Sequence, residues 1–152
     1  MKGNVKILSG IIIFISILFS QSSCKKEENP NIKLGRINFA IDPNSTQFIR
    51  LNTVGGWEYI TTQAPSRGVI VYRNTPDEFF AYERTPPNSP NECFNGDNYT
   101  HLVVDFPWVI DTCMDAKYNI ITGGIQEGPG RYPLYRLKAV YDGITLRVFN
   151  NK

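Results

Sequence analysis

Short apolar runs separated by turn signals are the feature that most constrains how this chain can fold. Beyond residue 24, no window of about 11 residues or more shows the spacing of an amphipathic helix. Instead, stretches rich in Val, Ile, Tyr, Phe and Thr alternate with clusters of Gly, Pro, Asn and Asp. This pattern is typical of strands joined by turns. The sequence therefore predicts an all-β, single-domain protein.

The apolar runs define a set of candidate strands. They cover residues 36–41, 47–53, 57–62, 68–73, 79–84, 101–105, 109–112, 118–121, 134–141 and 145–150. Asp142-Gly143, between two alternating runs, is the strongest hairpin signal in the chain. The stretches 85–97 and 123–133 are irregular, and long loops on a rigid sheet are common sites of function.

Residues 1–23 have the layout of a secretory signal peptide. Lys2 and Lys6 precede an apolar segment over 7–19, which is shorter than the about 20 residues that cross a bilayer. The whole chain has 16 Lys and Arg against 14 Asp and Glu, so removal of this peptide leaves a neutral protein. No run of basic residues is interleaved with aromatics. We therefore expect no nucleic-acid partner.

Cys24 directly follows Ser22 and Ser23 and resembles the lipobox cysteine of bacterial lipoproteins, although Gln21 stands where that family usually has Leu. The resemblance implies cleavage before Cys24 and a diacylglycerol on its sulfur, so that the protein contacts the outer membrane through a lipid anchor. The alternative is ordinary secretion with a free Cys24 thiol. In the lipid-anchored protein, residues 24–36 would form a tether, and the folded domain would cover residues 37–150.

The segment 25–28, Lys-Lys-Glu-Glu, resembles the surface-export signal of some outer-membrane lipoproteins. We therefore expect the protein at the cell surface, with a periplasm-facing orientation as the alternative. Cys93 and Cys113 also belong to the exported part of the chain, where two cysteines commonly pair. Such a bridge would stabilise the domain by roughly 3 kcal/mol on the chain-entropy model. The alternative is two separate buried thiols.

The order of motifs over residues 37–150 resembles a Rieske domain. The runs 68–73 and 79–84 lead into a Pro-rich loop with Cys93, and the segment 113–119 (Cys-Met-Asp-Ala-Lys-Tyr-Asn) is similar to the family's Cys-His-Gly-Ser-Lys/Arg-Phe-Asp. Gly128-Pro129-Gly130 and Pro133-Leu134 follow where the family has a cluster-covering Gly-Pro-Ala loop and a returning strand. The resemblance implies an antiparallel β-sandwich or barrel with an inserted, loop-rich subdomain at about 85–131.

Members of this family bind a 2Fe–2S cluster through Cys-x-His and Cys-x-x-His boxes. Aligned with these boxes, Pro86, Asn88, Asp111 and Met114 stand at the four ligand positions. None of them is a cysteine or a histidine, so the prediction is a degenerate site with no cluster and no other metal. Cys93 and Cys113 match the family's two non-ligand cysteines, whose disulfide lies beside the cluster.

Other chemistry has weaker support in the sequence. Asp111, Cys113 and Asp115 share one face of an extended segment and are compatible with Ca²⁺, although a solvated loop edge is the favoured interpretation. The one histidine, His101, falls in a candidate strand and is interpreted as structural rather than catalytic. No serine has a Gly-x-Ser-x-Gly setting. A hydrolase would therefore need a base that the sequence does not show.

These observations predict a non-enzymatic lipoprotein module that binds or assembles with an unidentified protein or small molecule. The alternative is a Rieske-type electron-transfer protein. The two differ at the four ligand positions.

Overall fold

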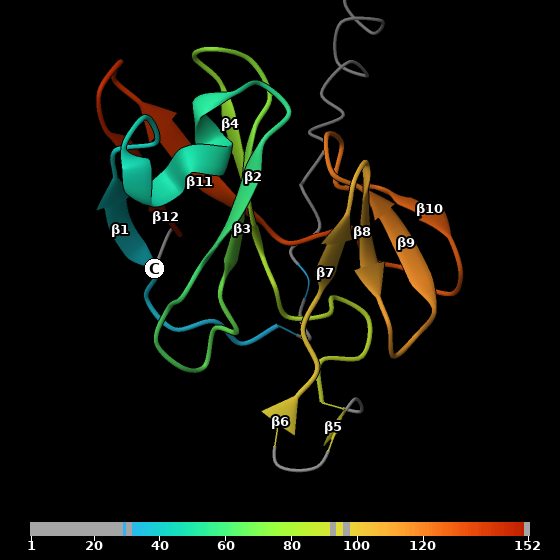
Figure 1. Ribbon diagram of the computed structural model, residues 1–152. Helices are drawn as coiled ribbons and strands as arrows, with labels where there is room; N and C mark the ends of the chain where they lie inside the picture. The colour runs from blue at the N-terminus through green and yellow to red at the C-terminus, as the bar shows by residue number, and fades with distance from the viewer. Residues whose placement is uncertain (1–28, 30–31, 92–93, 96–97, 151–152) are drawn as a thin grey trace, which may run out of the picture.

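The computed structural model describes residues 29, 32–91, 94–95 and 98–150, and its strands pair in antiparallel fashion throughout (Figure 1). The prediction of an all-β fold is confirmed. The elements are β1 (Asn38–Ile41), η1 (Thr46–Asn52), β2 (Trp57–Ile60), β3 (Val69–Arg73), β4 (Phe79–Glu83), β5 (Phe94–Asn95), β6 (Asn98–Tyr99), β7 (Val103–Asp105), β8 (Trp108–Asp111), β9 (Ala116–Asn119), β10 (Ile125–Glu127), β11 (Arg136–Tyr141) and β12 (Leu146–Phe149).

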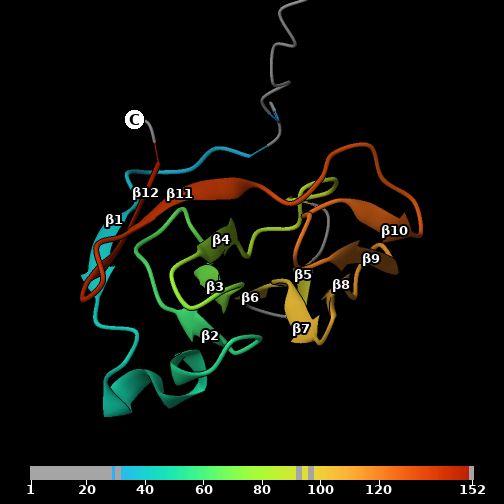
Figure 2. The same ribbon diagram turned by 90° about the horizontal axis from the view of Figure 1, so that it is seen from above.

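The strands form two main sheets. A base sheet has the order β1-β12-β11-β4-β3-β2, and a second sheet has the order β10-β9-β8-β7. The second sheet is inserted in the chain between β4 and β11, as is the small β5-β6 hairpin. Figures 1 and 2 show the two sheets side by side, with the short 3-10 helix η1 at the end of the base sheet away from the second sheet.

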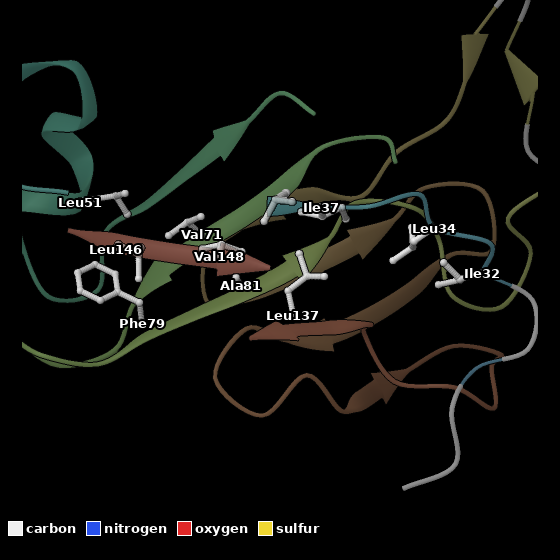
Figure 3. Packing of buried hydrophobic residues seen from close by; sticks show 11 residues of the cluster. Ile32, Leu34, Ile37, Leu51, Val71, Phe79, Ala81, Leu137, Leu146 and Val148 are labelled. Carbon is white, nitrogen blue, oxygen red and sulfur yellow. The ribbon is translucent and has the colours of Figure 1, made fainter. Parts of the chain in front are cut away.

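The β3-β4 hairpin separates two apolar cores. Because side chains alternate across a strand, Val69 and Val71 of β3 enter one core, whereas Ile70 and Tyr72 enter the other. β4 alternates in the same way. The first core lies against η1, β1 and β12 (Figure 3), and the second lies against the inserted sheet. A strand buried on both faces needs apolar residues at nearly every position, which explains the uninterrupted runs in the sequence.

The predicted strand over 47–53 is wrong, because this segment forms the 3-10 helix η1. In a 3-10 helix, residues three apart lie on the same side. Phe48 and Leu51 accordingly pack against the first core, while Ile49 and Arg50 are exposed. The Phe and Leu of this segment are thus spaced for a short helix, although its apolar content also fits a strand.

The folded region begins earlier than predicted. Ile32 and Leu34, assigned to the tether from the sequence, are buried in the first core. Asn29 is also buried, and its Nδ2 donates a hydrogen bond to the carbonyl oxygen of Pro87 at 2.6 Å. Asn29, Ile32 and Leu34 therefore pack into the folded domain and are not part of a free linker. Residues 1–23, which were predicted to be a signal peptide, lie outside the described residues, as do Cys24 and Cys93.

The remaining strand predictions agree with the structure in position but not in their ends. β7 starts at Val103 rather than 101, and β9 starts at 116 rather than 118. The short strands β5 and β10 fall in stretches that the sequence marked as irregular, and β6 directly follows the first of these stretches. The hairpin at Asp142-Gly143 is confirmed, since it joins β11 to β12. Within the described part of the chain, no helix is long and apolar enough to cross a membrane.

Candidate functional site

The side chain of Asn88 joins the two loops that the sequence singled out. Its Nδ2 donates hydrogen bonds to the hydroxyl oxygen of Tyr118 at 2.9 Å and to the carbonyl oxygen of Tyr132 at 3.0 Å. Its Oδ1 accepts hydrogen bonds from the backbone N–H groups of Arg131 at 2.7 Å and Tyr132 at 2.8 Å. Both ends of the amide are therefore engaged. We call this arrangement of Asn88, Tyr118, Arg131 and Tyr132 the Asn88 junction.

The Gly-Pro-Gly loop lies directly against this junction. A Cβ atom at Gly130 would come within 2.7 Å of the Asn88 Nδ2 atom. Gly128 has φ +84°, and a Cβ there would lie 2.3 Å from the backbone oxygen of Asp115. Only glycine tolerates both that dihedral and that approach. The loop is thus packed against Asn88 on one side and the β8-β9 turn on the other.

Asp111 closes the turn between β8 and β9. Its Oδ1 accepts hydrogen bonds from the backbone N–H groups of Cys113 at 3.0 Å and Met114 at 3.3 Å. Its side chain is buried, and Oδ2 has no hydrogen-bond partner among the described residues. The interpretation of Asp111 as part of a solvated loop edge is therefore wrong. Asp115 is exposed, and no group of three or more potential metal ligands occurs within the described residues.

Tyr118 connects Asn88 with the surroundings of Asp111. Its side chain is completely buried, and burial raises the pKa of its hydroxyl. The hydrogen bond from Asn88 works in the opposite direction, whereas the negative charge of Asp111 adds to the rise in this pKa. The structure thus brings Asn88 and Asp111 into one electrostatic environment. Sequence reasoning missed Tyr118, although the alternation of β9 placed it on the buried face.

The four aligned positions form a poor donor set for an iron–sulfur cluster. Pro86 is buried and offers no side-chain donor. Asn88 uses its amide within the junction, and Asp111 Oδ1 holds a turn. Met114 packs against the second core and offers a weak thioether. Since cluster irons take thiolates and imidazoles, these residues do not fit a 2Fe–2S group.

Cys113 lies within the turn that Asp111 closes, and it is disulfide-bonded. Cys24 and Cys93, the two cysteines that are available as its partner, lie outside the described residues. The pairing of Cys93 with Cys113 therefore stays a prediction.

A pocket of about 600 Å³ lies where β3 begins and β4 ends. Its described lining residues are Ile32, Lys33, Thr61, Thr62, Ala64, Pro65, Ser66, Arg67, Gly68, Arg84, Thr85, Pro90, Asn91 and His101. Lys33, Arg67 and Arg84 give it positive charge, and no carboxylate is among the described residues that line it. Sequence reasoning missed this pocket because its residues are far apart in the chain and match no motif.

The buried carboxylate of Glu83 accepts hydrogen bonds from residues that form the pocket wall. Glu83, which is fully buried, accepts hydrogen bonds from the hydroxyl of Ser66 at 2.6 Å and the backbone N–H of Arg67 at 2.8 Å. It also accepts hydrogen bonds from the hydroxyl of Thr85 at 2.7 Å and its N–H at 3.1 Å. Because the Ser66 hydrogen goes to Glu83, Thr62 is the donor in the hydrogen bond between the Thr62 and Ser66 hydroxyls.

His101 is not part of a strand, contrary to the prediction. It is exposed, precedes β7 and lines the pocket. Within the described residues, no hydrogen bond joins it to a serine or threonine hydroxyl. The described lining of the pocket therefore presents cations, hydroxyls and one imidazole.

No family model matches this chain, and neither the curated proteins nor the solved structures contain a match.

Proposed function

We propose that the protein is a lipid-anchored, non-enzymatic binding module of the outer membrane with a Rieske-like fold that holds no cluster. The pocket beside Arg84 is the proposed binding site. Under this proposal the four positions aligned with the cluster ligands of Rieske domains keep only a structural role.

The full engagement of the Asn88 side chain is the observation that carries this proposal. All four of its hydrogen bonds go to the protein itself, and two of its partners lie in the loop that follows β10. An amide used in this way is unavailable to a metal ion. The position that a ligand histidine would occupy in the family therefore serves to fasten one loop to another.

The arrangement of the chain supports the Rieske-like part of the proposal. An inserted sheet between two strands of a base sheet is the organisation that the motif order implied. The Gly-Pro-Gly loop packs against Asn88 and the β8-β9 turn, the two places aligned with the ligand boxes. These contacts agree with the family's order of box, box and covering loop.

The pocket supports binding rather than catalysis. It is large enough for a small molecule, since ligand pockets commonly measure about 300–1,000 Å³. Two of its cations, Arg67 and Arg84, are held by hydrogen bonds and a cation–π contact, and the Ser66 hydroxyl donates to Glu83. A hydrolase would instead need a free hydroxyl next to a base.

Potentiometry separates the proposed module from an electron carrier. The full chain, purified anaerobically in neutral detergent after growth with iron, is titrated with dithionite across about −150 to +300 mV, the range of Rieske centres. We expect no protein-dependent uptake of an electron in this range. A reversible one-electron step would overturn the proposed function. Mediators titrated without protein provide the baseline.

A further inference from the structure

Three cationic side chains, Lys33, Arg67 and Arg84, line the pocket at the β3-β4 end. No carboxylate is among the described residues that line it, and Glu83 lies fully buried behind the wall. Four donors surround the Glu83 carboxylate, and all four are neutral hydroxyl or backbone N–H groups. The described lining of the pocket therefore offers a ligand cations and hydroxyl groups.

Arg84 is held in a fixed orientation toward this space. Its Nε donates a hydrogen bond to the carbonyl oxygen of Leu102 at 3.2 Å, and its guanidinium carbon lies 3.7 Å from the ring centre of Tyr59. Burial lowers the pKa of Arg84, with the ring of Tyr59 and the carboxylate of Glu83 opposing this. None of the described residues accepts a hydrogen bond from its two terminal nitrogens. A guanidinium fixed in this way presents two parallel donors, which suit an oxyanion.

Arg67 and Lys33 complete the positive lining. Arg67 Nη1 donates to the carbonyl oxygen of Thr100 at 2.7 Å and Nη2 to that of Pro90, so its guanidinium fastens the two loops that flank the pocket. Lys33 is exposed at the pocket. A mobile ammonium on the rim adds attraction without fixed geometry. Arg84 thus provides an oriented pair of donors, Arg67 holds two loops together, and Lys33 provides a flexible cation.

We propose that this pocket binds the oxyanion of a small molecule or headgroup, with phosphate as its simplest form, and that Arg84 is the residue that recognises it. The inference rests on the proposed binding function and gives it a ligand class. An anion between Arg84 and Lys33 would contact two of the cations that line the pocket.

The ligand has two possible sources with the same chemistry. One is a free phosphorylated solute. The other is a lipid headgroup, because Cys24 lies five residues before Asn29, and an extended chain of that length reaches about 17 Å. Asn29 is hydrogen-bonded to Pro87, close to the pocket residues Thr85 and Pro90. Lipidation at Cys24 would therefore hold the pocket near the membrane surface.

NMR titration of the full chain in neutral detergent micelles tests the proposal. Inorganic phosphate is the first probe, and the soluble lipid dihexanoyl phosphatidic acid is the second. We expect the Arg84 Nε–H resonance to shift saturably, while the exposed Arg147 on β12 stays unchanged and serves as the internal control. Tighter binding of the lipid by about tenfold or more assigns the pocket to a headgroup, and equal binding assigns it to a solute.

Substitutions give the second measurement. Arg84→Gln should weaken phosphate binding by about tenfold or more, because it removes the charged donor pair. Lys33→Gln leaves the core untouched and should weaken binding severalfold, so it serves if Arg84→Gln fails to fold. Binding of neither probe, or equal binding by Lys33→Gln and the unchanged chain, overturns the proposal. If the protein takes up no electron in the potentiometric titration and binds neither phosphate nor dihexanoyl phosphatidic acid, the proposed binding function stands. Only the proposed ligand class is then rejected.

Discussion

Replacing Asn88 by alanine tests how far the Asn88 junction stabilises the domain. The substitution removes four hydrogen bonds and opens the contact between the loop after β4 and the loop after β10. The Tyr118 side chain is fully buried, so its hydroxyl would lose a partner that water replaces poorly. Leaving such a group unsatisfied costs about 1–3 kcal/mol.

The other three hydrogen bonds contribute less. Arg131 is exposed and Tyr132 is half-buried, so water can reach their backbone groups after the substitution. A net contribution of about 0.5 kcal/mol for each such bond lies at the low end of the usual range. We therefore expect Asn88→Ala to lower the free energy of unfolding by about 2.5–4.5 kcal/mol, a large part of the about 5–15 kcal/mol of a typical domain.

Urea unfolding of the full chain in neutral detergent, followed by Trp57 and Trp108 fluorescence, measures this change. Asn91→Ala is the matched control, because Asn91 is exposed in the same loop and should change the free energy by less than about 0.5 kcal/mol. Tyr118→Phe removes the hydroxyl alone and should show an interaction energy with Asn88→Ala of about 1 kcal/mol. A loss below about 0.5 kcal/mol for Asn88→Ala would refute the structural role of the junction.

Three further predictions concern other parts of the chain. Burial raises the pKa of Tyr82 to about 12 from an ordinary value of 10.0. Its hydroxyl therefore ionises more easily in the unfolded chain, and the free energy of unfolding should be undiminished below pH 10 and fall as the pH rises toward 12; the fall should shrink in Tyr82→Phe, and equal falls would contradict the assignment. Cys24 should carry a diacylglycerol, so mass spectrometry of the membrane fraction should find a lipidated Cys24, and Cys24→Ala should be released or left unprocessed; an unmodified Cys24 in that fraction rules out the anchor. Cys93 and Cys113 should be joined, so that thiol counting on the unfolded, unreduced protein finds neither free and their loss costs about 2–5 kcal/mol; two reactive thiols would show that no bridge exists.

The sequence predicted the strands of the core well because their burial follows directly from the chemistry of alternate residues. β3 and β4 are apolar at almost every position since both of their faces are covered. It failed at η1, where Phe48 and Leu51 satisfy a spacing of three while the segment as a whole is rich enough in apolar residues to suggest a strand. The spacing of Phe48 and Leu51 favours a short helix, whereas the apolar content of the segment favours a strand. Packing of these two side chains against the first core selects the helix.

The sequence also located part of the candidate site. The alignment with the two ligand boxes selected Asn88 and Asp111, which both interact with Tyr118 in the fold. The pocket could not be predicted from the sequence, because Lys33, Arg67 and Arg84 are brought together only by the β3-β4 hairpin and by the packing of residues 32–34 against the domain. The burial of Ile32 and Leu34 in that tether depends on long-range packing that no local pattern signals.

Iron analysis after attempted reconstitution tests most directly whether the four degenerate positions can hold a cluster. The full chain is incubated anaerobically with ferrous iron and sulfide in neutral detergent, desalted, and examined by visible absorption and elemental analysis. Iron and sulfide carried through the same steps without protein set the background. We predict a colourless protein with iron at that background. A brown protein with about two irons per chain, the content of a 2Fe–2S centre, would contradict the proposed function.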